Sequence, residues 1–129
     1  ADALDREADR VFCCDLLSFV MGRAPADSAW VTVMGNVNAV AVAVLADTAC
    51  IVLAENAPLD GEARSRADGQ GVPVLGSPHP VFDTGLLIQR LLENLLRRRM
   101  FFGVERREWC EESGLRSAYP FGSLPLRGQ

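Results

Sequence analysis

Residues 37–47 of the chain read Val-Asn-Ala-Val-Ala-Val-Ala-Val-Leu-Ala-Asp, and the conformation of this stretch decides the fold. The strict alternation of Ala and Val is typical of a strand, and the preceding Gly35-Asn36 could turn a hairpin. Ala, however, is a poor strand former and a good helix former, and Asn38 is a suitable N-cap for a helix over residues 38–47. Because such a helix is apolar all round, we expect it to be buried between layers. The local pattern leaves helix and hairpin open.

Four short apolar or β-branched runs around this stretch predict strands at residues 11–14, 30–34, 49–54 and 72–75. Helices are predicted at residues 16–22 with Asp15 as N-cap, at 59–70 with Asp60 near the start, and from about residue 82 with Asp83 in the first turn. The apolar face of the last helix is expected to consist of Leu86, Leu87, Leu91, Leu92, Leu95 and Leu96.

The conformation of residues 38–47 determines how these elements assemble. If they are helical, strand and helix alternate four times, which is typical of an α/β protein with a mainly parallel sheet. We therefore expect a four-stranded sheet between two layers of helices, in a three-layer α/β/α domain over residues 1–99. Residues 100–129 show no sustained period, and we expect them to form a C-terminal extension that is irregular or packed on a partner.

Composition narrows the class of protein. The chain has 129 residues, 49% of them hydrophobic, which suffices for one domain with its own core. No apolar run is as long as a bilayer span and residues 1–10 are acidic, so we expect a cytoplasmic protein that does not bind membranes. The net charge of −4 argues against nucleic-acid binding. The four cysteines lack CxxC spacing, so we expect reduced thiols and no metal or cofactor.

Polar side chains follow each predicted strand where it ends. In a parallel sheet these ends meet at one edge, and binding crevices lie beyond that edge. We therefore predict a ligand site formed by Asp15, Thr32, Asn36, Asn38, Glu55 and Ser77. Asn38 at a helix N-terminus would offer backbone amides to an anionic or carbonyl group, whereas Asp15 and Glu55 would oppose a bare polyphosphate. The alternative role is structural, because Asp, Asn and Ser are also the ordinary residues of turns and caps.

Several of these segments together resemble a known family. They are Asp15-Leu16-Leu17-Ser18-x-Val20-Met21, Trp30-Val31-Thr32-Val33 followed by Asn38-x-Val40-Ala41-Val42-Ala43, Ala49-Cys50-Ile51-Val52-Leu53-Ala54-Glu55, and Gly71-Val72-Pro73-Val74-Leu75. Over residues 10–96 the chain resembles the DRTGG-domain proteins, in particular the stand-alone bacterial type that is often encoded beside iron hydrogenase genes. The chain departs from them in lacking the DRTGG string and in the loop at residues 34–38, where similar proteins more often have Gln and His before Asn.

The resemblance implies a helix at residues 38–47 and a compact α/β/α domain that tends to form homodimers. It also implies a regulatory or structural role, as in the related domains that accompany phosphotransacetylases, pyrophosphatases and HPr kinase. A further implication is a scaffold or accessory role beside a redox enzyme of the hydrogenase type.

We expect the chain to be a non-catalytic module that senses a small polar molecule, for which a nucleotide is one candidate. The sequence has no GxxxxGK[ST] or GxGxxG loop, and its single histidine, His79, has no Ser or Cys placed beside it as a nucleophile. A dimeric scaffold that pairs through the Leu-rich helix is the alternative, followed by a small enzyme using Asp15 and Glu55. The Arg-rich residues 97–107 would suit nucleic acid, but they suit a helix C-terminus equally, and nearby Glu residues neutralise them.

Overall fold

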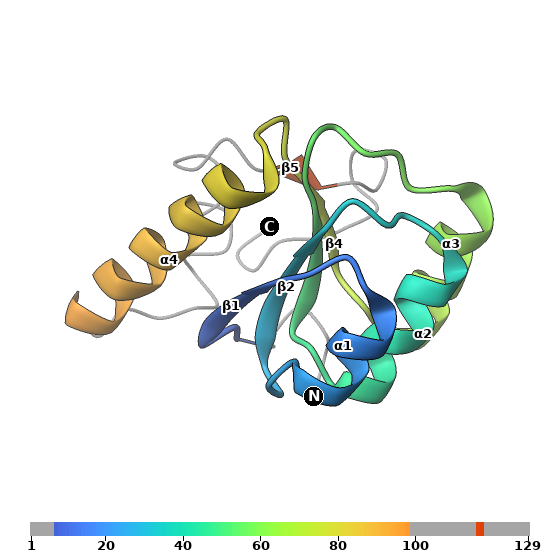
Figure 1. Cartoon of the computed structure of the whole chain (residues 1–129), viewed down its shortest axis with the longest axis horizontal. Helices are drawn as coiled ribbons and strands as arrows, with labels where there is room; N and C mark the ends of the chain where they lie inside the picture. The colour runs from blue at the N-terminus through green and yellow to red at the C-terminus, as the bar shows by residue number, and fades with distance from the viewer. Residues whose placement is uncertain (1–6, 99–115, 118–129) are drawn as a thin grey trace.

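The structure, a computed structural model, describes residues 7–98 and 116–117 of the chain (Figure 1). Within these residues four strands alternate with four helices, and a two-residue strand follows. In chain order the elements are β1 (Arg10–Cys13), α1 (Leu17–Arg23), β2 (Ser28–Thr32), α2 (Val37–Ala46), β3 (Cys50–Leu53), α3 (Gly61–Gln70), β4 (Val74–Gly76), α4 (Val81–Arg98) and β5 (Arg116–Ser117).

The strands form one sheet in the order β1-β2-β3-β4-β5. β1 to β4 are parallel to one another, and β5 pairs antiparallel with the outer edge of β4. The predicted α/β class with a mainly parallel four-stranded sheet is therefore confirmed. Of the predicted C-terminal extension, only Arg116 and Ser117 fall within the described residues, where they pair with Gly76 and Leu75.

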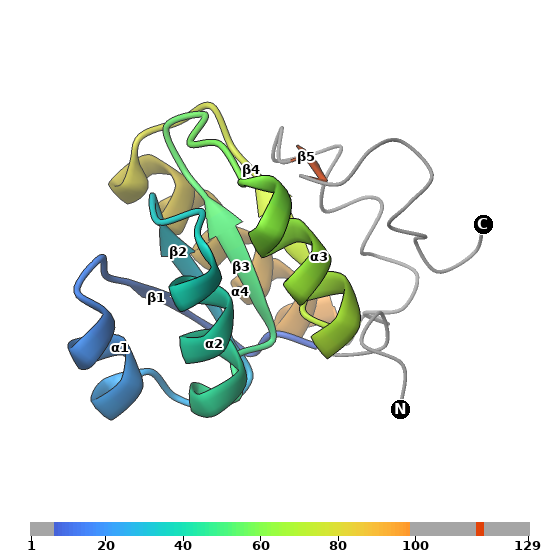
Figure 2. The same cartoon turned by 90° about the vertical axis from the view of Figure 1, so that its right-hand side faces the viewer.

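Helices cover both faces of the sheet, but in unequal numbers (Figures 1 and 2). α1, α2 and α3 pack side by side on one face, and α4 lies on the other face against β1 and β2. The strand order explains this division. The crossovers that contain α1, α2 and α3 each lead to the next strand on the same side of the sheet. Right-handed crossovers that advance in one direction place their helices on one face. The three-layer α/β/α arrangement is therefore confirmed.

The molecule has two apolar cores, one on each face of the sheet. Strands β1 to β4 contribute side chains to both, because successive side chains of a strand point to opposite faces. The core under α1, α2 and α3 receives Trp30, Ile51, Leu53 and Val74 from the strands. The core under α4 receives Ala29, Val31, Cys50, Val52 and Leu75. β3 is buried along its whole length, which explains why its sequence is uninterruptedly apolar rather than alternating.

The stretch that decides the fold is helical. α2 spans Val37–Ala46, one residue from the predicted bounds, and ends at Asp47 in the left-handed conformation with a φ of 60°. β2 and β3, which flank it in the chain, are parallel neighbours, so the hairpin alternative is excluded. The prediction that this helix is buried between layers is wrong. Leu45 is 70% exposed, because α2 lies in an outer layer between α1 and α3 with only one side towards the sheet.

Two capping predictions are also wrong. Asn36 caps α2, since its Oδ1 accepts a hydrogen bond from the amide of Ala39 at 3.0 Å. Asn38 already lies inside the first turn and is exposed. α1 has Leu16 at its N-cap position and no side-chain cap, because the carboxylate of Asp15 is hydrogen-bonded to the exit of the neighbouring strand.

The remaining boundaries shift by a few residues. β2 begins at Ser28, two residues earlier than predicted. β4 begins at Val74, after Pro73, whose missing N–H cannot join a strand ladder. α3 begins at Gly61, two residues after the predicted start at residue 59, because Asp60 is its N-cap and accepts a hydrogen bond from the amide of Ala63 at 2.7 Å.

The predicted leucine face of α4 is confirmed only in part, because Leu92 is buried while Leu87 and Leu91 are half-buried. Thr84, Ile88 and Leu92 face the sheet and are buried, whereas Leu86 is 36% exposed and Phe82 is 73% exposed. Two positions along a helix correspond to a rotation of about 200°, so Leu86 and Ile88 lie on nearly opposite sides. The last two predicted leucines lie beyond the residues whose side chains the structure describes. In the described part of the chain, no helix has the length and apolar character needed to cross a membrane.

A glycine allows α4 to approach β1 closely. A Cβ atom at Gly85 would lie 2.7 Å from the Sγ atom of Cys13. Gly85→Ala should therefore combine a helix-propensity gain of about 1 kcal/mol with a steric penalty. In a Cys13→Ala background the steric penalty disappears. We therefore expect Gly85→Ala to stabilise the Cys13→Ala chain by about 1 kcal/mol more than it stabilises the natural chain. Urea denaturation of the four variants measures this coupling, and strict additivity would contradict the packing described.

Candidate functional site

The carboxyl ends of the four parallel strands lie at one edge of the sheet. The register places Cys13 beside Val31, Thr32 beside Leu53, and Leu53 beside Gly76. The loops that leave these strands therefore lie in a row, and the polar residues predicted as a site are distributed along that row.

At one end of the row, Asp15 links the exit of β1 to β2. Its Oδ1 atom accepts hydrogen bonds from the hydroxyl of Thr32 at 2.8 Å and from the amide of Val33 at 2.9 Å. The Thr32 hydroxyl, which is fully buried, in turn accepts from the amide of Met34 at 3.2 Å. The carboxylate and hydroxyl that the sequence predicts as ligand-binding groups thus hold two strand ends together.

Asp15→Ala is expected to lower the free energy of unfolding by about 1–2 kcal/mol, because it leaves a buried hydroxyl without its acceptor. Asp15→Asn keeps an acceptor oxygen and should lose less. Asp9→Ala is the control, because the Asp9 carboxylate forms an exposed ion pair with Arg10 at 3.1 Å, and such pairs contribute little. Urea denaturation compares the three variants. Equal stability of Asp15→Ala and Asp9→Ala would show that the Asp15 carboxylate does not stabilise the strand ends.

β3 leaves the sheet through a turn with an uncommon backbone. Glu55 and Asn56 both have positive φ, 60° and 55°, and the amide of Ala57 donates to the carbonyl of Ala54 at 2.9 Å. This is the pattern of a type I′ turn. Asn tolerates positive φ well, whereas for Glu it costs on the order of 1 kcal/mol. Strained backbone of this kind is enriched at functional sites, which makes the β3 exit a candidate for one.

Hydrogen bonds tie this turn to the loop after β4. The amide of Glu55 donates to the carbonyl of His79, and the amide of Asn56 donates to the carbonyl of Ser77, both at 2.9 Å. The buried Ser77 hydroxyl pairs with that of Thr84 at 2.8 Å and accepts from the amide of His79 at 3.1 Å. The Ser77 side chain is thus engaged in holding the start of α4, and the exits of β3 and β4 form one connected unit.

The connections that follow β3 and β4 leave the sheet on opposite faces. The β3–α3 connection turns to the face covered by α1, α2 and α3, and the β4–α4 connection turns to the face covered by α4 (Figure 2). In parallel sheets, ligands bind where neighbouring connections diverge, because the two loops leave a crevice between them. Among β1 to β4, the β3–β4 pair is where this divergence occurs, since the connections after β1 and β2 turn to the same face as that after β3.

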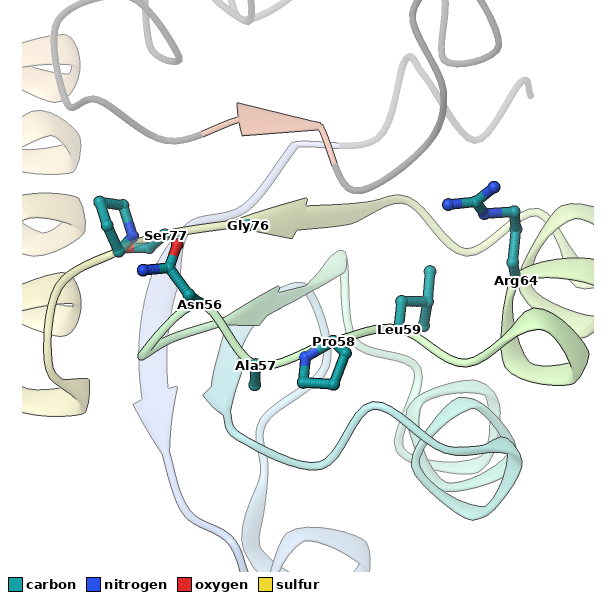
Figure 3. Close-up of a pocket in the computed structure, with 8 residues that line it drawn as sticks. Asn56, Ala57, Pro58, Leu59, Arg64, Gly76 and Ser77 are labelled. Atoms are coloured by element: carbon teal, nitrogen blue, oxygen red, sulfur yellow. The ribbon is translucent and has the colours of Figure 1, made fainter.

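A hollow of about 270 Å³ lies at this divergence (Figure 3). It is lined by Asn56, Ala57, Pro58 and Leu59 of the β3–α3 loop, by Arg64 of α3, and by Gly76, Ser77 and Pro78 at the end of β4. Figure 3 shows Asn56 beside Ser77 at one end, with Leu59 and Arg64 towards α3 at the other. This volume lies just below the roughly 300–1,000 Å³ of typical ligand pockets, so the hollow suits a molecule smaller than most pocket ligands.

Of the predicted site residues, Ser77 lines this hollow and Glu55 directly precedes it in the chain. Asp15 and Thr32 are hydrogen-bonded to each other at the β1–β2 end of the edge. The other two predicted residues, Asn36 and Asn38, lie at the start of α2. The structure therefore divides the predicted site into separate groups along the edge rather than one cluster.

Two polar residues of the hollow were not among the predicted site residues. Asn56 could have been predicted from the sequence, because it follows the strand at the same exit as Glu55. The sequence indicates Arg64 less clearly. It lies one turn after the Asp60 cap, which places it at the end of α3 nearest the carboxyl edge of the sheet. Nothing in the sequence distinguishes Arg64 from Arg66, which is exposed on the same helix.

Among the described residues, no cluster of metal-ligand side chains is present and the Cys13 thiol is not activated. No group of three or more His, Cys, Asp or Glu side chains in the described ranges is placed to hold a metal ion. Cys13 is exposed at the surface but partly desolvated, and this desolvation, with smaller contributions from the charges of Asp15 and Cys14, raises the pKa of its thiol. At neutral pH this thiol is therefore protonated, and a protonated thiol is a poor nucleophile.

Comparisons of the chain with protein-family models, with curated proteins and with solved structures found no match. The likeness to the DRTGG-domain proteins therefore rests on the sequence segments alone and stays a prediction. What the structure establishes is the class of fold, a parallel α/β sheet with helices on both faces, and the position of a hollow at its carboxyl edge.

Proposed function

We propose that this chain is a ligand-sensing module that binds a small polar molecule in the hollow between the exits of β3 and β4. The observation that carries the proposal is the coincidence of this hollow with the place where neighbouring connections of the parallel sheet diverge. The resemblance to regulatory DRTGG domains supports the same class of function.

The composition of the hollow suits a molecule with both apolar and polar parts. Pro58, Leu59 and Pro78 provide apolar walls, and Asn56 and Arg64 provide hydrogen-bonding groups. An amide side chain can both donate and accept, so Asn56 suits a hydroxyl, amine or carbonyl group. A mainly apolar lining with a few polar groups is the usual composition of small-molecule sites.

Chemical-shift mapping tests the proposal directly. The ¹⁵N-labelled chain is titrated with a panel of five probes at up to 10 mM: D-ribose, D-ribose 5-phosphate, D-ribonate, adenosine and AMP. We expect at least one probe to shift the amide signals of Asn56, Ala57 and Ser77 in a saturable manner. If no probe moves these signals, or if saturable shifts are confined to the start of α2, the hollow is not the binding site.

Two variants separate the hollow from the site predicted at the start of α2. Asn56→Asp keeps a residue that tolerates positive φ but replaces an amide with a carboxylate, so we expect it to weaken the binding of the tightest probe by about 10-fold. Asn38→Leu alters an exposed position outside the hollow and should leave binding unchanged. The reverse pattern would favour the α2 site and contradict the proposal.

A homodimeric scaffold is the second candidate function, favoured by apolar side chains on the outer face of α4. Phe82 and Leu86 lie one turn apart and are 73% and 36% exposed. Pairing across a two-fold axis would bury both. Light scattering at several concentrations should then give twice the mass of the monomer for the natural chain and the monomer mass for Phe82→Glu. A monomeric natural chain would refute the dimer.

A further inference from the structure

We infer that the ligand of the hollow carries an oxyanion (a phosphate or a carboxylate) and that the Arg64 guanidinium binds it. This inference rests on the proposed function. Arg64 is the charged residue among the described side chains that line the hollow, and the other lining residues are neutral. The chain as a whole has a net charge of −4. A single positive side chain in an otherwise neutral lining favours an anionic group on the ligand at that point of the hollow.

The position of Arg64 suits this role. It lies one turn into α3, where its amide donates to the carbonyl of Asp60 at 2.9 Å and the Asp60 side chain caps the helix. Its backbone is therefore held in regular helix next to the hollow, and its side chain is half-buried. A guanidinium group presents several N–H donors in one plane and can form two parallel hydrogen bonds with a carboxylate or a phosphate.

The shape of the hollow sets the size and polarity of the ligand. Arg64 and Asn56 lie at opposite ends, with Pro58 and Leu59 between them (Figure 3). An anionic group at Arg64 would therefore leave the body of the ligand against the apolar wall and its other polar end near Asn56. A volume of about 270 Å³ suits a sugar phosphate, a sugar acid or a nucleoside monophosphate, and is too small for a dinucleotide.

The probe panel contains matched pairs that test the charge. D-ribose 5-phosphate differs from D-ribose by its phosphate, and AMP differs from adenosine by its phosphate, whereas D-ribonate is an open-chain sugar acid that offers a carboxylate instead. We expect the anionic members to bind at least 10-fold more tightly than their neutral partners, with affinities that fall as NaCl is raised from 50 to 500 mM. Comparison of D-ribose 5-phosphate with D-ribonate shows whether phosphate or carboxylate is preferred.

The role of Arg64 is tested by calorimetric titration of variants with the tightest anionic probe. Arg64→Gln should weaken binding about 10- to 100-fold, and Arg64→Lys should restore part of the loss because it keeps the charge without the planar donor pair. Arg66→Gln is the matched control, because it removes the same charge from an exposed position of α3. Circular dichroism checks that each variant is folded, and Arg64→Lys keeps the test informative if Arg64→Gln does not fold.

The outcomes distinguish this inference from the function on which it rests. If adenosine or D-ribose shifts the signals of the hollow as strongly as its anionic partner, and neither Arg64 variant changes the affinity, the hollow binds neutral ligands. The inference is then wrong and the proposed function stands. If Arg64→Gln and Arg66→Gln weaken binding equally, general charge attraction replaces the specific contact and the inference is also wrong. If no probe shifts the hollow, both fail.

Discussion

Replacing Gly35 with alanine is expected to lower the free energy of unfolding by about 2–3 kcal/mol, because the loop after β2 packs directly against the loop after β3. A Cβ atom at Gly35 would overlap the carbonyl oxygen of Pro58 and lie 2.9 Å from its carbonyl carbon. Both are backbone atoms, so the clash cannot be relieved by rotating a side chain. The hydrogen bond from the amide of Asp60 to the carbonyl of Gly35, 3.0 Å long, would be strained as well.

Gly69→Ala is the matched control for this prediction. Gly69 lies in α3, and an added Cβ atom would meet nothing within 4 Å. Alanine should therefore raise the free energy of unfolding by up to about 1 kcal/mol, as expected for a glycine in a helix. Urea denaturation followed by circular dichroism measures both variants. If Gly35→Ala is as stable as the natural chain, the two loops are not in the close contact described.

The same substitution should affect the hollow. Pro58 and Leu59 form part of its lining, and they are the residues that an alanine at position 35 would displace. We therefore expect Gly35→Ala to weaken the binding of the anionic probes even at temperatures where the variant is fully folded. Gly69→Ala, which displaces nothing, should bind them like the natural chain.

Trp30→Ala is expected to have the largest effect on stability, a loss of about 3–5 kcal/mol. Trp30 is fully buried under the layer of α1, α2 and α3, and its indole Nε1–H donates to the carbonyl of Cys14 at 2.8 Å. The residue therefore fills the core and also ties the exit of β1 to the second strand. Because domains of this size are stable by only about 5–15 kcal/mol, the variant should lose a large fraction of its stability.

Trp30→Phe separates the two contributions. It keeps most of the apolar volume but removes the indole donor, so we expect a smaller loss of about 1–3 kcal/mol. Phe82→Ala provides the control, because this aromatic side chain is largely exposed and its removal should change the free energy of unfolding little. Circular dichroism is the appropriate probe, because a second tryptophan, Trp109, contributes to the fluorescence. A loss below 1 kcal/mol for Trp30→Ala would contradict the packing of this core.

The alternation of elements, and with it the fold class, could be predicted from sequence once residues 37–47 were taken as helix. Their pattern alone could not decide this. Ala–Val alternation has the two-residue period of a strand, but a stretch that is apolar throughout is equally compatible with a buried helix. The structure shows why a helix forms: the neighbouring strands pair in parallel, which requires a crossover between them. Asn36 caps this crossover rather than Asn38, a difference of two residues that local sequence could not decide because Asn suits either position.

The arrangement at the carboxyl edge could be predicted only in part. The sequence predicts that the polar strand exits share one edge of the sheet, and the register confirms this. Hydrogen-bonding partners across the sheet, which the sequence does not show, decide which of these exits are available to a ligand. Asp15 bonds to Thr32, seventeen positions away in the chain, and so does not cap the helix beside it. Strand order decides where neighbouring connections diverge, and no residue pattern encodes that order. The hollow beside Arg64 therefore follows from the topology and not from a motif.

A crystal structure of the chain grown with D-ribose 5-phosphate tests the central claim, that the hollow is the binding site, most directly. We predict electron density for the sugar against Pro58 and Leu59, with the phosphate oxygens at hydrogen-bonding distance from the Arg64 guanidinium. Density for the ligand at the start of α2 beside Asn36 and Asn38, or a hollow filled by the protein's own side chains, would contradict it.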